Sequence, residues 1–286
     1  MADERRRLAQ VRWPLVPAGF GAAFLTGLAG AWVLMAVGWW EGGAAWERAA
    51  LRAAHATVSP WLDPFFLVMP LFGTNYSLVP VVALAAVWLW RPPGRAGAAV
   101  LSTLGGVIGA GVVQAIGVFV VGGSAPLSLL LAAGIAGAAA VYWLDRRYPD
   151  RPARPVLAVH MAVAQAGSWI LNPALKFSVP RARPELFQQR GQHDFPAYPS
   201  GHSIAVTAVM FTAAYLIHRS GQGTWAYWAV GVFFLLNTYS RVYLSVHWPT
   251  DMIGGTLVGL VWLLALVAAF RPGHRSAGPR GPRPAS

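Results

Sequence analysis

The sequence has no cysteine and few charged residues. Charged residues make up 11% of its 286 residues, against about a quarter in a typical soluble domain. Without cysteine the chain forms no disulfides and has no thiolate metal ligand or cysteine nucleophile. The low charge accompanies 56% hydrophobic residues and a mean hydropathy of +0.49. This composition excludes a soluble enzyme, a disordered chain and a collagen-like chain.

Long apolar runs recur along nearly the whole chain. A run of about 20 apolar residues crosses the roughly 30 Å hydrocarbon core of a bilayer as a helix. No segment has a convincing strand pattern, so we expect an all-α, polytopic integral membrane bundle. About eight transmembrane helices are predicted, at residues 14–40, 75–92, 97–122, 127–144, 155–176, 202–218, 225–244 and 252–270.

Two segments between the first and second spans are predicted to lie at the interface. In residues 46–58 the charged side chains, Glu47 among them, fall largely on one side of a helix and Trp46 on the other. This pattern is typical of a helix that lies flat on a membrane surface. In residues 61–72 prolines flank and interrupt the apolar run, which favours an interfacial or re-entrant piece over a further span.

Lysine and arginine are distributed unevenly between the two sides of this predicted bundle. The side with both termini carries 15 of the 22 cations, and the other side carries 7. Because cytoplasmic loops are enriched in these residues, we expect both termini in the cytoplasm. The charges lie in short loops, so the net charge of +12 is explained by topology and no nucleic-acid partner is expected. The run 14–40 is too long for a signal-peptide core and is expected to remain as an anchor.

Small residues recur at a spacing of four in two predicted spans. The pairs are Gly105 with Gly109 and Gly255 with Gly259. Small residues one helical turn apart let two helices approach closely in a membrane. We therefore expect close helix contacts at both pairs.

Chemically active side chains concentrate at three span ends on the outer side. Lys176 is the only lysine beside 21 arginines. Three cations that converge with few anions nearby repel each other unless an anion lies among them, and a phosphate group fits that need. The cluster consists of Lys176 and Arg183, then Ser200, Gly201 and His202, and finally Arg241, His247 and Asp251.

Each member of this cluster also has an ordinary structural use. A lysine at a span end can extend its ammonium group to the interface, and Ser200 can cap the helix that follows it. A helix start is also an anion site, however, because its first N–H groups are free. Asp251 lies about one helical turn after His247, so its carboxylate can bond one imidazole nitrogen and leave the other free as nucleophile or base. The combination favours a catalytic site.

These three segments resemble the signature of the type 2 phosphatidic acid phosphatase superfamily. That signature is Lys, six residues, Arg-Pro; then Pro-Ser-Gly-His; then Ser-Arg, five residues, His, three residues, Asp. All eleven fixed identities occur here, in order and at the right spacings, between residues 176 and 251. The family core has six membrane helices, so residues 97–144 would form an additional hairpin.

The resemblance implies a role for each matching residue. Lys176, Arg183 and Arg241 would hold the phosphoryl oxygens, aided by Ser200 and the Gly201 amide. His247 would attack phosphorus while Asp251 orients it. His202 would protonate the leaving oxygen. The family uses no metal, and no cofactor is expected.

The expected activity is hydrolysis of a phosphomonoester or diphosphate of a lipid at the outer membrane face, through a phosphohistidine. Polyprenyl diphosphate, phosphatidylglycerophosphate and phosphatidate are the candidate substrates. The alternatives are a phosphotransferase of the same superfamily and a non-enzymatic transporter or structural membrane protein. The expected regions are an N-terminal tail, anchor and interfacial helix (1–59), a membrane phosphatase domain (60–270) and a disordered basic tail (271–286).

Further residues that lie in or near these segments, or in the same spans, also have predicted roles. Asn172 lies one turn before Lys176 and either orients it or holds helices together. Arg181 either assists the phosphate or contacts lipid headgroups. Tyr198 and His193 either shape the mouth of the site or are residues of a mobile loop. His160 is predicted to be structural.

Overall fold

A computed structural model describes residues 2–90, 94–117, 124–147, 154–190 and 195–271. Every regular element in these segments is helical, which confirms the all-α prediction. The predicted disordered tail lies outside the described residues except for Arg271, and so does His193. The helices are α1 (Ala2–Ala9), α2 (Leu15–Ala36), α3 (Ala45–His55), α4 (Asp63–Val68), η1 (Met69–Gly73), α5 (Asn75–Trp90), α6 (Gly94–Ile116), α7 (Leu127–Arg147), α8 (Pro155–Ser178), α9 (Gly201–Ala205), η3 (Val206–Met210), α10 (Phe211–Arg219), α11 (Trp225–Tyr243) and α12 (Pro249–Ala269).

A helix occurs at each of the eight predicted spans. Within the described segments, five continuous helical stretches are long and apolar enough to cross a membrane: Leu15–Ala36, Gly97–Gln114, Leu127–Arg147, Gly201–Arg219 and Pro249–Ala269. The stretches Asp63–Gly73 and Ser77–Trp90 make a sixth if they count as one broken span, with a bend of 49°. Both α8 and α11 carry buried polar side chains that lower their hydropathy. Their crossing of the membrane therefore stays a prediction.

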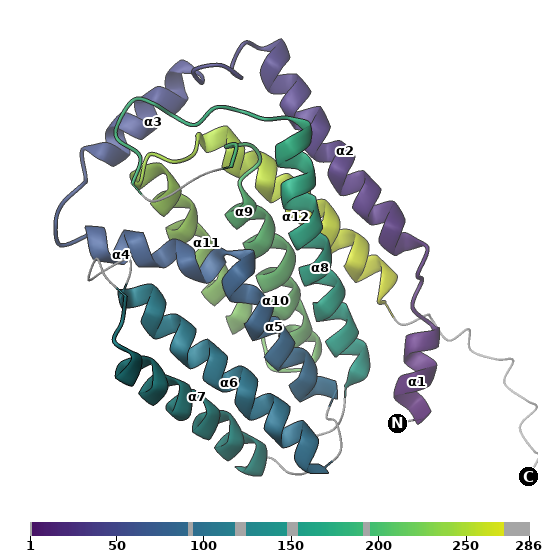
Figure 1. The fold of residues 1–286 in the computed structure, drawn as a ribbon. Coiled ribbons are helices and arrows are strands. Elements are labelled where there is room, and N and C mark those ends of the chain that lie inside the picture. Colours follow the sequence, from purple (N-terminus) through teal and green to yellow (C-terminus); the bar gives the residue numbers. More distant parts are fainter. Residues whose placement is uncertain (1, 91–93, 118–123, 148–153, 191–194, 272–286) are drawn as a thin grey trace, which may run out of the picture.

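The helices form a bundle (Figure 1). In this bundle α12 contacts α2, α3, α8, α9, η3 and α10. The first anchor α2 packs along α12 and also touches α8. At this contact Gly19 lies so close to Ala265 that an added Cβ would come within 2.2 Å of its side chain. The predicted boundary at 59/60 is untested, but α2 packs directly onto the remainder of the bundle. The hairpin of α6 and α7 lies at the edge and reaches the bundle through α5 (Figure 1).

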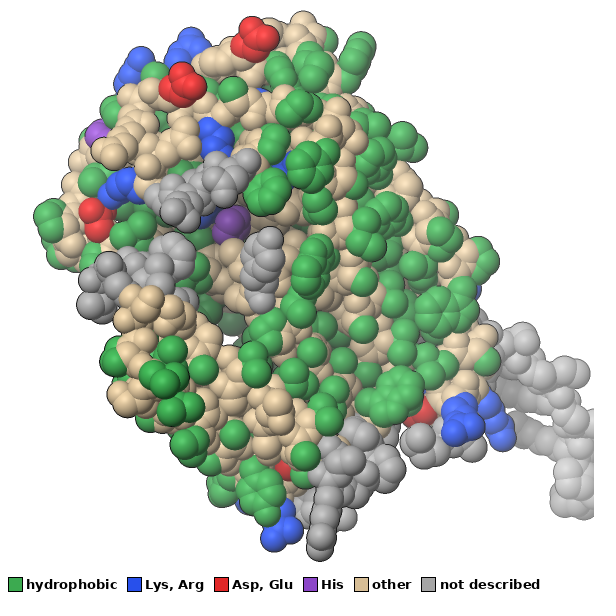
Figure 2. All heavy atoms as spheres, viewed as in Figure 1, with side chains coloured by type: hydrophobic (Ala, Val, Ile, Leu, Met, Phe, Trp, Pro, Cys, Tyr) green, Lys and Arg blue, Asp and Glu red, His purple; other side chains and the backbone are tan. Residues whose placement is uncertain are grey.

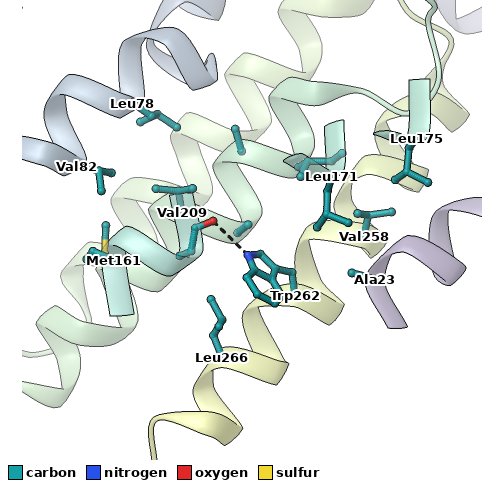
Figure 3. Packing of buried hydrophobic residues seen from close by; sticks show 14 of the residues in the cluster. Ala23, Leu78, Val82, Met161, Leu171, Leu175, Val209, Val258, Trp262 and Leu266 are labelled. Carbon is teal, nitrogen blue, oxygen red and sulfur yellow. Dashed lines mark hydrogen bonds between the residues drawn. The ribbon is translucent and has the colours of Figure 1, made fainter. Parts of the chain in front are cut away.

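Trp262 of α12 is the largest side chain in the main apolar core (Figure 3). Its indole Nε1 donates to the Ala164 carbonyl of α8 at 3.2 Å. Gly167, one turn further along α8, makes room for the ring, since an added Cβ would lie 2.3 Å from it. A hydrogen bond that satisfies the indole lets this large side chain be buried without an unpaired polar atom. This contact fixes α8 against α12, and both helices carry site residues.

Both predicted glycine pairs lie at close helix contacts, which confirms that expectation. An added Cβ would lie 2.5 Å from the Val141 side chain at Gly105 and 2.3 Å from the Ala133 carbonyl at Gly109. On α12 it would lie 2.4 Å from the Ser200 carbonyl at Gly255 and 2.8 Å from Thr207 at Gly259. The contact at Gly255 brings the start of α9 against α12.

Charged side chains gather at the two ends of the bundle, and apolar side chains cover the middle of the face in Figure 2. The N-terminal segment and the end of α12 lie together, because the Arg12 N–H donates to the Ala269 carbonyl at 3.0 Å. The loop that leaves α8 lies at the opposite end, beside α3 (Figure 1). This arrangement is what a helix bundle needs to lie in a bilayer.

Candidate active site

Three segments of the signature meet at the end of the bundle opposite the termini. The Ser200 N–H donates to the Asp251 carbonyl at 2.9 Å, which joins α9 to α12. The Lys176 ammonium group at the end of α8 donates to the Pro196 carbonyl. The Arg183 guanidinium donates to the carbonyl of Val246, next to His247. These hydrogen bonds hold the end of α8, the loop that follows it, the start of α9 and the segment around the start of α12 together.

His247 lies in a tight turn between α11 and α12. Ser245 has a φ of 58°, a left-handed conformation that few non-glycine residues adopt. The Val246 N–H donates to the Arg241 carbonyl at 3.1 Å, which closes the turn. The His247 side chain is only 3% exposed. A strained turn with a buried histidine is typical of a functional position.

Asp251 lies in the first turn of α12 and faces the imidazole, at the predicted spacing. Its Oδ2 accepts a hydrogen bond from the Trp248 N–H at 2.8 Å and lies 3.3 Å from Nδ1 of His247. The carboxylate thus caps α12 and also contacts the histidine. With Nδ1 facing the carboxylate, the other ring nitrogen, Nε2, is the one available for chemistry.

Three cations lie near the imidazole: Lys176 and Arg241 are buried, and Arg183 is half-buried. Lys176 and Arg241 are 6% and 3% exposed. Burial lowers the pKa of Arg183 from its usual value. Burial also holds the pKa of His247 well below 6.5, and the charges of Arg183, Lys176, Arg241 and His202 lower that pKa further. The imidazole is therefore neutral at physiological pH, as a nucleophile must be.

The start of α9 contributes Ser200 and Gly201. The Ser200 side chain does not cap the helix, so that structural alternative is wrong. Its Oγ is buried and has no hydrogen-bond partner among the described residues. Gly201 lies against Asn172, where an added Cβ would come within 2.7 Å of the amide group. Asn172 therefore packs closely against the start of α9.

His202 occupies the first turn of α9 and is partly exposed. It lies near enough to His247 for its charge to lower the pKa of that residue. His202 thus comes from α9 and His247 from the turn before α12. Their roles in catalysis stay predictions.

Tyr198 is not at the mouth of the site, and that prediction is wrong. The side chain is 1% exposed, and its hydroxyl donates to the Gly27 carbonyl of α2 at 3.0 Å. Gly30 and Gly254 provide the space for the ring between α2 and α12. His160 is buried and stacks on Phe270 with ring centroids 4.3 Å apart, in agreement with a structural role.

Glu47 and Arg181 are misplaced by the sequence-based predictions. Arg181 neither joins the cations that are predicted to bind the phosphate nor reaches the lipid surface. It is 1% exposed and donates to Asp251 Oδ1 at 2.7 Å. Glu47, predicted on the polar surface of the interfacial helix, is 0% exposed, and its carboxylate contacts Arg181 and Thr250. The sequence signal that could have drawn attention to Glu47 is the rarity of carboxylates, because the chain has only 10 acidic residues.

Comparisons with known proteins agree with this geometry. The family model "PAP2 superfamily" matches residues 157–274. The chain is 31% identical over 145 residues to YbjG of Escherichia coli, a match covering 48% of this chain and 67% of that protein; the name of YbjG provisionally assigns it undecaprenyl-diphosphatase activity. The chain belongs to the PAP2 superfamily.

Two further similarities extend the comparison. Phosphatidylglycerophosphatase B of Bacillus subtilis is 36% identical over 106 residues, so the match covers 35% of this chain and about half (51%) of that relative. The crystal structure of a transmembrane PAP2-type phosphatidylglycerolphosphate phosphatase from Bacillus subtilis superposes with a TM-score of 0.56 at 20% identity, over 87% of this chain and 94% of that one. The latter similarity shows the fold alone. Together with the apolar helices, it identifies this PAP2 chain as a multi-pass membrane protein.

Proposed function

We propose that this PAP2 protein is a metal-independent lipid phosphatase that hydrolyses a phosphomonoester or diphosphate of a lipid through a phosphohistidine on His247. The observation that carries the proposal is the buried imidazole of His247, 3.3 Å from the Asp251 carboxylate and near the charges of Lys176, Arg183 and Arg241. Cations gathered around a buried nucleophile can bind an anion that the nucleophile attacks. Structural headgroup contacts alone would not require a buried histidine–aspartate pair.

The reaction is a double displacement at phosphorus. Nε2 of His247 attacks, the bond from phosphorus to the lipid oxygen breaks, and His202 gives its proton to that oxygen. Water then attacks the phosphohistidine. His202 takes a proton from this water, phosphate leaves, and His247 is restored. Asp251 stabilises the positive charge that the imidazole acquires in between.

Fixed cations replace a metal in this scheme. Lys176, Arg183 and Arg241 neutralise the phosphoryl oxygens throughout, and the Ser200 hydroxyl and Gly201 amide donate further hydrogen bonds. Because helix ends hold most of these groups and the Val246 carbonyl holds Arg183, they need little rearrangement when charge develops. Many phosphatases assign this task to a divalent ion.

The substrate class follows from the site's position and from the relatives. The site lies at the ends of membrane helices, so a headgroup within one leaflet can bring its phosphate to it. The names of the relatives refer to phosphatidylglycerophosphate and undecaprenyl diphosphate. The proposed substrates are such membrane-anchored phosphates, including phosphatidate.

Phosphate release from purified lipid phosphates, measured in EDTA, tests this function. We expect turnover of at least one of the three lipids that chelation does not reduce. Lys176→Arg should lower the rate strongly although it keeps the charge, because the larger planar guanidinium does not fit the place of an ammonium group. Arg52→Lys, an exchange on the exposed part of α3, is the matched control. Activity abolished by EDTA and restored by magnesium would contradict the mechanism.

The proposed orientation places both termini in the cytoplasm and the site outside. Single cysteines introduced into the cysteine-free chain provide the test with a reagent that does not cross membranes. We expect labelling of intact cells at Ser178 and Glu185 but not at Arg146 or Arg219. The reverse pattern would invert the topology and require a substrate from the inner leaflet.

A further inference from the structure

Arg181 uses its guanidinium group entirely within the protein. Nε donates to the Trp40 carbonyl at 3.0 Å and Nη2 to the Trp39 carbonyl at 2.6 Å. Nη1 donates at 2.7 Å both to Asp251 Oδ1 and to Thr250 Oγ1. The side chain has no exposed surface. These contacts leave Arg181 no part in binding the phosphate of a substrate.

Glu47 holds the other side of this arginine. Its Oε2 lies 3.5 Å from Arg181 Nη2 and accepts from the Ala44 N–H at 2.9 Å. Its Oε1 accepts from both the N–H and the hydroxyl of Thr250, at 3.0 and 2.7 Å. Glu47 thus ties α3 to the first turn of α12, next to Asp251. A buried carboxylate with this many partners is held in one orientation.

The contacts leave the Asp251 carboxylate little freedom to rotate. Arg181 holds Oδ1, while the Trp248 N–H and the imidazole share Oδ2. A carboxylate held at both oxygens presents a fixed lone pair to Nδ1 of His247. Because Nδ1 is then the protonated nitrogen, the lone pair of Nε2 faces the phosphate site.

We propose that Arg181 and Glu47 are positioning residues that act through Asp251 to keep His247 in its reactive tautomer and orientation. This inference depends on the proposed phosphatase function. It also assigns a catalytic use to α3, which lies outside the segment 157–274 that matches the family model. Glu47 and Thr250 are 203 positions apart in the sequence.

A double-mutant cycle of Arg181→Met and Asp251→Asn tests the inference. Alone, Arg181→Met should lower kcat about 10–100-fold, the range for groups that orient a catalytic ligand. KM should stay within about twofold, because the phosphate ligands are untouched. Asp251→Asn should lower kcat by roughly 10³–10⁴-fold. In the Asp251→Asn background, Arg181→Met should cost less than about threefold more, because residues that act as one unit are not additive.

Two milder variants cover the case in which Arg181→Met does not fold. Thr250→Val removes the hydroxyl between Glu47 and Arg181, and Glu47→Gln puts an amide donor against Ala44 N–H or Thr250 N–H. Both should lower kcat about 3–30-fold with KM unchanged. Glu41→Gln, an exposed carboxylate shortly before α3, is the matched control and should leave kcat unchanged. Thermal unfolding in detergent identifies variants that are unfolded at the assay temperature.

The outcomes separate this inference from the proposed function. Multiplicative losses in the cycle, or a raised KM with unchanged kcat for Arg181→Met, would overturn the positioning role while the phosphatase function stands. Equal activity of Glu47→Gln and Glu41→Gln would remove α3 from the mechanism. If the folded wild-type protein released no phosphate from any of the three lipids, the proposed function would fall and the inference with it.

Discussion

Replacing His247 with alanine is expected to abolish turnover and the covalent intermediate together. Removing a nucleophile costs on the order of 10⁶-fold in kcat when no other group can form the intermediate. The wild-type enzyme, quenched during turnover of a ³²P-labelled lipid phosphate, should carry acid-labile, base-stable phosphate. Peptide mapping should locate this phosphate on His247.

His218→Ala is the matched control, since His218 is exposed at the far end of α10. It should keep both the rate and the phosphoenzyme. Phosphate that persists on His247→Ala would assign the nucleophile to another residue, and phosphate mapped to His202 would exchange the two roles.

The pH dependence of the same reaction follows from the environment of His247. Burial and the neighbouring cations hold its pKa well below 6.5. A lowered pKa keeps the imidazole neutral, and therefore nucleophilic, at pH values where an ordinary histidine is half protonated. The acid limb of kcat/KM should therefore lie below pH 6.5. An acid limb above that value, if it belonged to His247, would contradict the buried cationic environment.

The second large effect is expected for His202→Ala, and it should depend on the leaving group. General acid catalysis contributes typically 10²–10⁴-fold, so hydrolysis of a lipid phosphomonoester should fall by about that factor. A nitrophenolate leaves without a proton. The same variant should therefore lose less than about tenfold on p-nitrophenyl phosphate.

The ratio of the two rates is the informative quantity. His247→Ala should lose activity on both substrates equally, because hydrolysis of both needs the nucleophile. If His202→Ala also lost activity on both substrates equally, His202 would be a phosphate ligand or a structural residue. Recovery of the phosphoenzyme from His202→Ala on nitrophenyl phosphate would show that attack by His247 is intact.

The bundle was predictable because a membrane leaves few alternatives to helices. Backbone groups in hydrocarbon must pair within their own segment, so an apolar run of sufficient length is a helix. The glycine pairs were predictable for a similar reason, since close approach requires the absence of a side chain at one spacing. The limit of this reasoning is visible at α8 and α11. Their buried polar residues lower the hydropathy, and their crossing of the membrane depends on packing against other helices.

Glu47 of α3 was placed wrongly because periodicity cannot distinguish water from a buried partner. Glu47 lies on the polar side of the helix by pattern, and that side is usually solvated. Here Glu47 faces the Arg181 guanidinium, which compensates the buried charge. Arg52 and His55 on the same side are exposed. Tyr198 was also misplaced. Glycines of α2 and α12 make room for its ring, and the sequence around a tyrosine in a loop does not indicate this.

The sequence by itself determined the membrane bundle and predicted the residues of the candidate phosphate site. Its chemically active side chains are rare against an apolar background, and the spacing of His247 and Asp251 places them one helical turn apart. Only the tertiary structure decided how Asp251 is held. Its partners Arg181 and Glu47 come from a loop and from a helix remote in sequence, and pairing of buried charges depends on distances that local periodicity does not encode.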